Sequence, residues 1–147
     1  MTALLDVNVL IALFDPEHIH YETAHAWFGG PSRGSWATCP LTENGFVRIV
    51  ANPGYPGRRT TVADAAERLR IFCEIGDHEF WSDSLSLRDR RHLAAGSIRG
   101  HRQITDVYLL ALATKNGGVL VTFDDSIPIA AVPGADADCI VLLRPDK

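Results

Sequence analysis

The stretch TALLDVNVLIAL, residues 2–13, decides how this chain folds. It begins with the apolar run Ala3-Leu4-Leu5, meets a single acid at Asp6, and continues as a second apolar run from Val7. Two apolar runs this close together predict a buried strand that leads directly into a buried helix. A carboxylate between them is costly to bury unless a cation or a hydrogen-bond donor compensates its charge. Asp6 therefore either caps the helix or belongs to a functional site.

The composition is that of one globular domain. Of the 147 residues, 46% are hydrophobic and 22% are charged, which argues against a disordered chain and predicts a single domain over residues 1–147. The formal net charge of −4 excludes a general polyanion-binding surface, so contact with nucleic acid requires a local basic patch. The three cysteines form no CxxC pair and indicate reduced thiols. We expect a soluble, cytoplasmic protein without a membrane-spanning segment.

Short strands alternate with helices along the rest of the chain. We expect further strands at residues 36–39, 79–82, 119–122 and 139–143. Helices are expected at residues 20–28, 41–51, 61–75 and 87–95, the last capped by Ser86, and from residue 104 to the glycines at 117 and 118. This alternation predicts an α/β fold, a mostly parallel central sheet with helices on both faces.

Four acids lie close to the strand ends or helix starts of this predicted fold. Asp6 follows the first strand and Asp124 the fourth, while Glu43 and Asp106 lie in the first turns of helices. Because the carboxyl ends of parallel strands meet at one edge of the sheet, we expect the four acids to converge there. Each also has an ordinary explanation, as a turn residue or as a partner of a helix dipole. Four carboxylates close together, however, cannot all stay ionised without a cation.

An all-oxygen site of this kind selects hard cations, so Mg²⁺ is the expected occupant and Mn²⁺ is possible. Such a site suits phosphoryl chemistry, because one bound metal ion activates a water for in-line attack and a second, if present, supports the leaving oxygen. Asn8, Thr105 and Thr122 lie one or two residues from the acids and could orient a carboxylate or a metal-bound water. Thr105 fits a helix cap equally well.

A basic stretch, residues 88–102, precedes Asp106 and contains one acid, Asp89. Its position next to a predicted site residue suggests a track for RNA phosphates, because backbone contacts supply most of the affinity for nucleic acids. A solvated face or a contact with a dimer partner is the alternative interpretation. The candidate RNA contacts are Arg90, Arg91, Arg99, His101 and Arg102.

Four runs of the sequence resemble the motifs of PIN-domain ribonucleases, and most closely those of the VapC toxins of bacterial toxin–antitoxin pairs. The runs are LLDVNVLIAL, PLTENGFVRIV, HRQITDVYLLALA and VLVTFDDS. The resemblance extends from Leu4 to about Ser126, with the motifs in the family's order and spacing. It implies a PIN-like three-layer sandwich.

The resemblance also implies a function. In the family pattern Asp6, Glu43, Asp106 and Asp124 are the metal-binding, catalytic acids. The activity implied is that of a Mg²⁺-dependent endoribonuclease, with structured RNA such as tRNA or rRNA as the expected substrate. The expected assembly is a homodimer that a small VapB-type antitoxin wraps and inhibits.

One position departs from the family pattern. Many relatives have a basic residue directly after the fourth acid, whereas this chain has Asp125, which leaves open whether Asp125 joins the surroundings of the metal.

Two alternative functions remain open on the sequence. The first is a PIN module that binds RNA or protein without cleaving, and the presence of all four acids argues against it. The second is a metal-dependent DNA nuclease or phosphatase on a similar sheet. Asp6 is followed by Val7-Asn8 and not by a second acid at the DxD spacing, which argues against an aspartyl-phosphate route.

Overall fold

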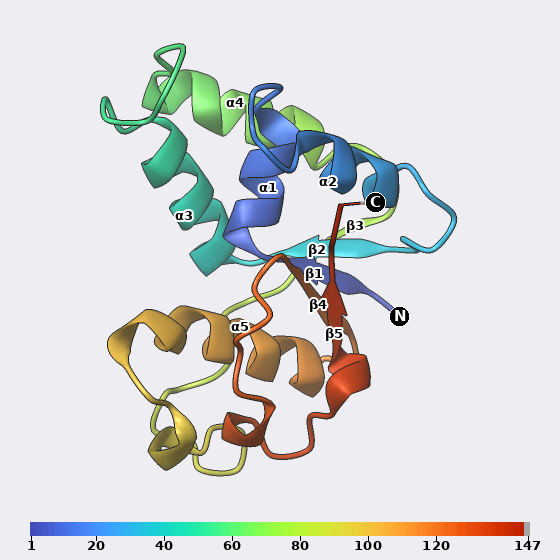
Figure 1. Ribbon diagram of the computed structural model, residues 1–147, viewed down its shortest axis with the longest axis vertical. Helices are drawn as coiled ribbons and strands as arrows, with labels where there is room; N and C mark the ends of the chain where they lie inside the picture. The colour runs from blue at the N-terminus through green and yellow to red at the C-terminus, as the bar shows by residue number, and fades with distance from the viewer. Residues whose placement is uncertain (146–147) are drawn as a thin grey trace.

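The computed structural model describes residues 1–145 and places a central sheet between two layers of helices (Figure 1). Within these residues the sheet has five strands in the order β3-β2-β1-β4-β5, and every neighbouring pair is parallel. The strands are β1 (Ala3–Leu5), β2 (Trp36–Thr38), β3 (His78–Phe80), β4 (Val119–Thr122) and β5 (Ile140–Leu142).

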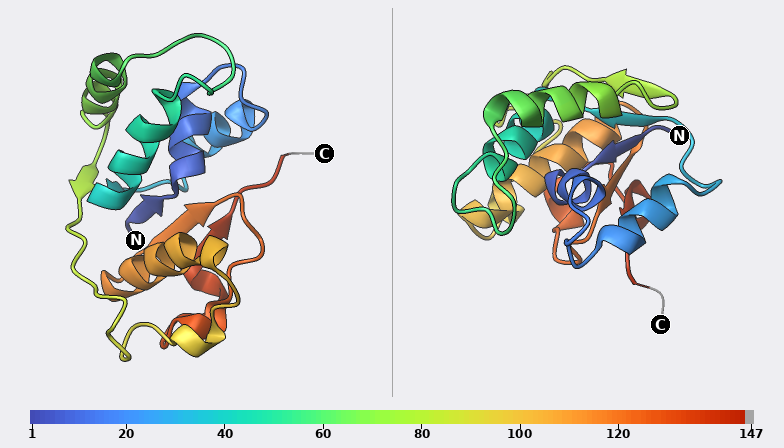
Figure 2. Two further views of the ribbon diagram at one scale, coloured as in Figure 1. Left: turned by 90° about the vertical axis from the view of Figure 1, so that its left-hand side faces the viewer. Right: turned by 90° about the horizontal axis from the view of Figure 1, so that it is seen from above.

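Helices cover both faces of this sheet, as Figure 2 shows in its left view. One layer contains α1 (Val7–Phe14), α2 (Tyr21–Phe28), α3 (Pro40–Val50) and α4 (Val62–Phe72). The other contains α5 (Ile104–Lys115) with single turns of 3₁₀ helix at Ala95–Ser97, His101–Gln103, Ile129–Ala131 and Ala137–Cys139. The predicted three-layer α/β architecture is therefore confirmed. No helix within residues 1–145 is both long enough and apolar enough to span a bilayer.

The strand side chains alternate between two apolar cores, as the pleat of a strand requires. Leu5 and Val121 pack into the core under α1 to α4, whereas Leu4 and Leu120 pack into the core under α5. Because both faces are covered, both sets of side chains are buried, and the strands appear in the sequence as continuous apolar runs.

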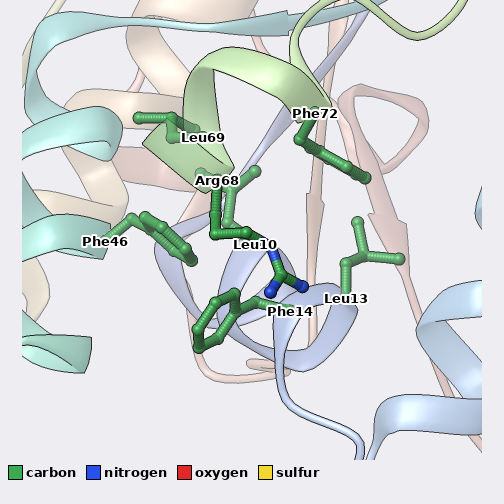
Figure 3. Close-up of a pocket in the computed structure, with 7 residues that line it drawn as sticks. All are labelled: Leu10, Leu13, Phe14, Phe46, Arg68, Leu69 and Phe72. Atoms are coloured by element: carbon green, nitrogen blue, oxygen red, sulfur yellow. The ribbon is translucent and has the colours of Figure 1, made fainter. Parts of the chain in front are cut away.

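The layer of α1, α3 and α4 closes around a small apolar pocket (Figure 3). The rings of Phe14 and Phe46 meet edge to face with their centroids 5.3 Å apart, which joins α1 to α3. Arg68 extends from α4 across this pocket, and its guanidinium carbon lies 5.3 Å from the centroid of the Phe14 ring. These contacts fix the direction of α1, and with it the position of Asp6 at its start.

The pairing of β1 with β4 depends on a close approach at Gly118. A Cβ atom at this position would clash with the carbonyl oxygen of Thr2 and would lie 2.9 Å from the Trp81 ring, so the position requires glycine. The register that results places Leu5 opposite Val121, and the backbone N–H of Asp6 donates to the Val121 carbonyl at 3.0 Å. This backbone hydrogen bond holds Asp6, the first predicted acid, beside the end of β4.

One predicted element is wrong. Residues 87–95 form turns and not a helix, because side chains there hydrogen-bond to the local backbone and compete with helical bonding. The Ser86 hydroxyl accepts from the N–H of Arg88, and the Asp89 carboxylate accepts from the N–H of Arg91 at 3.0 Å. The other expected helices and strands are confirmed with small shifts at their ends; the helix expected at 61–75, for example, ends at Phe72.

Candidate functional site

Asp6 lies at the carboxyl end of β1, where it caps α1. One oxygen of its carboxylate, Oδ1, accepts from the N–H of Val7 at 2.7 Å, so the helix-cap interpretation is confirmed. The other, Oδ2, accepts from the Thr122 hydroxyl at 2.8 Å. The side chain is only 4% exposed, and this burial raises its pKa, with a further contribution from the charge of Asp124.

Thr122 links Asp6 to Asp124. Its hydroxyl is fully buried, donates to Asp6, and accepts from the backbone N–H of Asp124 at 3.1 Å. The Asp124 carboxylate in turn accepts from the backbone N–H and the hydroxyl of Ser126, at 2.8 and 2.6 Å. These two bonds lower the pKa of Asp124 and keep it ionised. A single buried hydroxyl therefore connects the Asp6 carboxylate to the backbone at Asp124.

Asp106 completes this group from the first turn of α5. Its half-buried carboxyl has a pKa raised to about 7, first by burial, then by the charge of Asp6 and by a hydrogen bond and charge from Asp124. The proximity of the two carboxyl groups raises the pKa of Asp106 and lowers that of Asp124, so Asp106 takes up a proton before Asp124 does. Asp6, Asp106 and Asp124, the aspartate cluster, thus repel one another enough to favour a proton or a cation among them.

Glu43 has a different set of partners. It lies in the first turn of α3, and its Oε2 accepts from the Thr38 hydroxyl at the end of β2, at 2.7 Å. The same hydroxyl oxygen lies 2.8 Å from Nε2 of His78. The ligand atoms of Glu43, Cys73 and His78 all lie within 4.8 Å of one another, a closer grouping than the aspartate cluster attains within residues 1–145. The meeting of all four acids at one cation stays a prediction.

The remaining predicted neighbours of the acids lie on the surface. Asn8, Thr105 and Asp125 are exposed, and none makes a side-chain hydrogen bond within the described part of the chain. The alternative role of Thr105 as a helix cap is wrong, because α5 begins at Ile104 and its N-cap is Gln103.

The basic stretch borders the aspartate cluster. Arg91 is paired with Asp89 at 3.2 Å. The other predicted RNA contacts form no ion pair within residues 1–145 and are exposed: Arg90, Arg99, His101 and Arg102.

Gln103 connects this stretch to the cluster. Its Oε1 accepts from the N–H of Arg99 at 3.0 Å, and its Nε2 donates to the carbonyl of Ser126 at 3.5 Å. Sequence analysis missed Gln103, Ser126 and Thr38, because no residue pattern distinguishes them before the strands are paired. Only their positions beside the predicted acids could have pointed to them.

Comparisons with known proteins relate this chain to a family. The family model described as "PIN domain" matches residues 3–133. The chain is 46% identical over 135 residues to Ribonuclease VapC44 of Mycobacterium tuberculosis (strain ATCC 25618 / H37Rv), an alignment that covers 92% of this chain and 94% of the relative. It is 43% identical to Ribonuclease VapC39 of the same strain over 134 residues, 91% of this chain and 96% of that one.

A solved structure shares the fold. The crystal structure of VapBC2 from Rickettsia felis, bound to a DNA fragment from their promoter, aligns with a TM-score of 0.53 and 14% sequence identity. The alignment covers 86% of this chain and 90% of that chain. At this identity the likeness concerns the fold alone.

The raised pKa of Asp106 predicts how stability depends on pH when no metal is bound. A carboxyl whose pKa is higher in the folded chain than in the unfolded chain favours folding at low pH, and this contribution is lost as the pH rises through about 7. We therefore expect the metal-free protein to lose stability between about pH 4 and about pH 7, the unfolded and folded pKa values of this carboxyl. Asp106→Asn should reduce this loss and stabilise the metal-free protein at the higher pH. Urea unfolding in a chelator measures both effects.

The matched control is Asp125→Asn, which removes the same charge from an exposed neighbour of the cluster and should leave the pH dependence unchanged. Equal pH dependence in wild type and Asp106→Asn would contradict the account of the cluster.

Proposed function

We propose that this chain, which belongs to the PIN-domain family and to the VapC ribonucleases within it, is a metal-dependent endoribonuclease that acts as the toxin of a toxin–antitoxin pair. The observation that carries the proposal is the aspartate cluster at the carboxyl ends of β1 and β4. Three carboxylates lie there with two of their pKa values raised, at the edge of a parallel sheet where ligands bind.

The donor set of the cluster fits a hard divalent cation. Its donors are carboxylate oxygens, which Mg²⁺ and Mn²⁺ prefer, and their mutual repulsion is relieved by a positive charge. Asp6, Asp106 and Asp124 would hold the ion, with Glu43 as the fourth acid implied by the family pattern. Bound there, a divalent cation supplies an activated water for attack on a phosphodiester bond.

The residues of the chain itself orient this site. Thr122 fixes one oxygen of Asp6, and Val7 fixes the other, so the carboxylate cannot rotate freely. Ser126 holds Asp124 in the ionised form in which it can act as a ligand. Asp106, whose pKa is near 7, is the group that exchanges a proton when a cation arrives. Hydrogen bonds of this kind set the direction of carboxylate ligands and tune their charge.

We propose that the exposed basic residues beside the cluster hold the RNA backbone. Arg99 is connected through Gln103 to the turn that contains Asp124, so phosphates bound along the stretch would lie next to the scissile bond. Arg90 and Arg102 have no acidic partner within the described chain, which leaves their guanidinium groups available to phosphate oxygens. Arg91 is a weaker candidate because Asp89 already pairs with it. Structured RNA, tRNA or rRNA, is the proposed substrate.

We also propose that a VapB-type antitoxin inhibits the enzyme. A cluster that favours a cation should accept a cationic side chain from a partner, most readily Arg, whose planar group pairs with two carboxylate oxygens. The structural neighbour from Rickettsia felis is itself described as VapBC2. The homodimer implied by the family resemblance remains part of this proposal.

The test of the enzymatic proposal is cleavage of total RNA by the purified chain with Mg²⁺ or with a chelator, with mapping of the new 5′ ends. Asp6→Asn should reduce cleavage at least about 100-fold, because one ligand and one charge are lost while the buried shape is kept. Asp77→Asn is the control and should cleave normally, because it removes an exposed charge directly before β3, at the amino ends of the strands. Cleavage that survives either the chelator or Asp6→Asn would refute the metal assignment.

A second experiment tests the basic residues. Arg102→Ala should weaken binding to all RNA sequences and flatten the dependence of binding on salt concentration, because fewer counterions are released on binding. Cleavage at saturating RNA should change much less than cleavage at low RNA. The control is Lys115→Ala, at the opposite end of α5, which removes the same charge away from the cluster. An unchanged salt slope for Arg102→Ala would assign this stretch to another role.

A further inference from the structure

We propose that Glu43, Cys73 and His78 form a second metal site, specific for a thiophilic transition-metal ion such as Zn²⁺. The three residues come from three elements: the first turn of α3, the C-cap of α4 and the first position of β3. Their ligand atoms already lie within 4.8 Å of one another without an ion. Only small side-chain movements are therefore needed to place all three around one cation.

The Thr38 hydroxyl positions two of the three side chains. It donates to Glu43 Oε2 at 2.7 Å, so its oxygen is left to accept from Nε2–H of His78 at 2.8 Å. Because Thr38 is completely buried at the end of β2, these contacts hold Glu43 and His78 in place. Such orientation before binding lowers the cost of forming a metal site.

The donor set distinguishes this site from the aspartate cluster. A thiolate and an imidazole nitrogen are ligands for Zn²⁺ and related ions, whereas Mg²⁺ is bound through oxygen. Binding replaces the proton on Cys73 Sγ by a bond to the metal, and this proton passes to solvent. His78 binds as a neutral imidazole through its unprotonated ring nitrogen, so it releases no proton. Three protein ligands leave one position of a tetrahedral ion open to water.

The surroundings permit an ion to enter. Glu43, Cys73 and His78 are each partly exposed and line an open cleft between α3, α4 and β3. Two arginines line the same cleft, and their charge opposes a cation. Arg70 is neutralised by Glu67 and Glu74, at 2.6 and 2.7 Å, which leaves Arg48 as the opposing charge.

Zn²⁺ at this site would also reduce RNA cleavage, because it withdraws Glu43 from the four acids that the family pattern assigns to the nuclease. This consequence rests on the proposed function, whereas metal binding does not. Metal binding and inhibition can therefore be tested separately: the first by binding of a metal ion to the protein alone, the second by cleavage of RNA.

The binding test uses Co²⁺ as a spectroscopic probe for the full chain stripped of metal. A bond between cobalt and a thiolate gives a charge-transfer absorption that oxygen ligands do not give, so the aspartate cluster cannot produce it. We expect this absorption to saturate at one ion per chain, to disappear when Zn²⁺ is added, and to persist in excess Mg²⁺. Cys73→Ser should abolish it, and His78→Gln should weaken Co²⁺ binding more than about 10-fold.

The control is Cys139→Ser, which removes another partly exposed thiol and should leave the absorption intact. Absence of the absorption in wild type, or equal loss in Cys73→Ser and Cys139→Ser, would overturn the site. Circular dichroism measures the fold of each variant. If Cys73→Ser is unfolded, the test uses His78→Gln, which keeps the thiol. Co²⁺ binding by His78→Gln as tight as that of the wild type would overturn the site.

The cleavage test compares Zn²⁺ inhibition at constant Mg²⁺. In the absence of Zn²⁺, Cys73→Ser should cleave RNA at the same rate as the wild type. When Zn²⁺ is added, the variant should resist the inhibition that the wild type shows. Equal inhibition of both proteins would refute the shared role of Glu43, and an intact cobalt absorption in a chain that does not cleave RNA would refute the proposed function alone.

Discussion

The candidate nuclease site depends on the hydrogen bond between the Thr122 hydroxyl and Oδ2 of Asp6, two residues that are 116 positions apart. An ionised carboxylate that is 4% exposed is costly to bury without donors, and Thr122 and the N–H of Val7 are the donors within residues 1–145. The Val7 bond is a local helix cap, whereas the Thr122 bond depends on the parallel pairing of β1 with β4, which Gly118 permits. The sheet thus brings Asp6, the first of the four predicted acids, close to Asp124, the last.

Much of the fold could be predicted from the sequence because its strands are buried on both faces. Continuous apolar runs such as Ala3–Leu5 and Val119–Thr122 can be recognised as buried strands, and the glycines at 117 and 118 mark the end of α5. The helix predicted at residues 87–95 is wrong, because apolar and charged residues there have helical spacing while Ser86 and Asp89 close local turns. Such competition depends on side-chain geometry and not on composition.

The site was predictable where it follows from topology and unpredictable where it depends on long-range packing. Asp6, Asp106 and Asp124 lie together because strands that alternate with helices direct their carboxyl ends to one edge. Glu43 lies in the first turn of α3, just beyond the carboxyl end of β2. The pairing of β2 with β3 brings His78 to it, and the end of α4 brings Cys73. No motif joins those two residues to Glu43, and only the assembled structure brings the three side chains together.

The most direct test of this account is the Mg²⁺ concentration that gives half-maximal RNA cleavage by Thr122→Val, which removes the hydroxyl and keeps the side-chain shape. We predict that this concentration rises about 10–100-fold, because Asp6 loses the donor that orients it. Thr122→Ser, which retains a hydroxyl, and Thr114→Val, whose hydroxyl bonds only within α5, should remain close to wild type. An unchanged Mg²⁺ requirement in Thr122→Val would contradict the account.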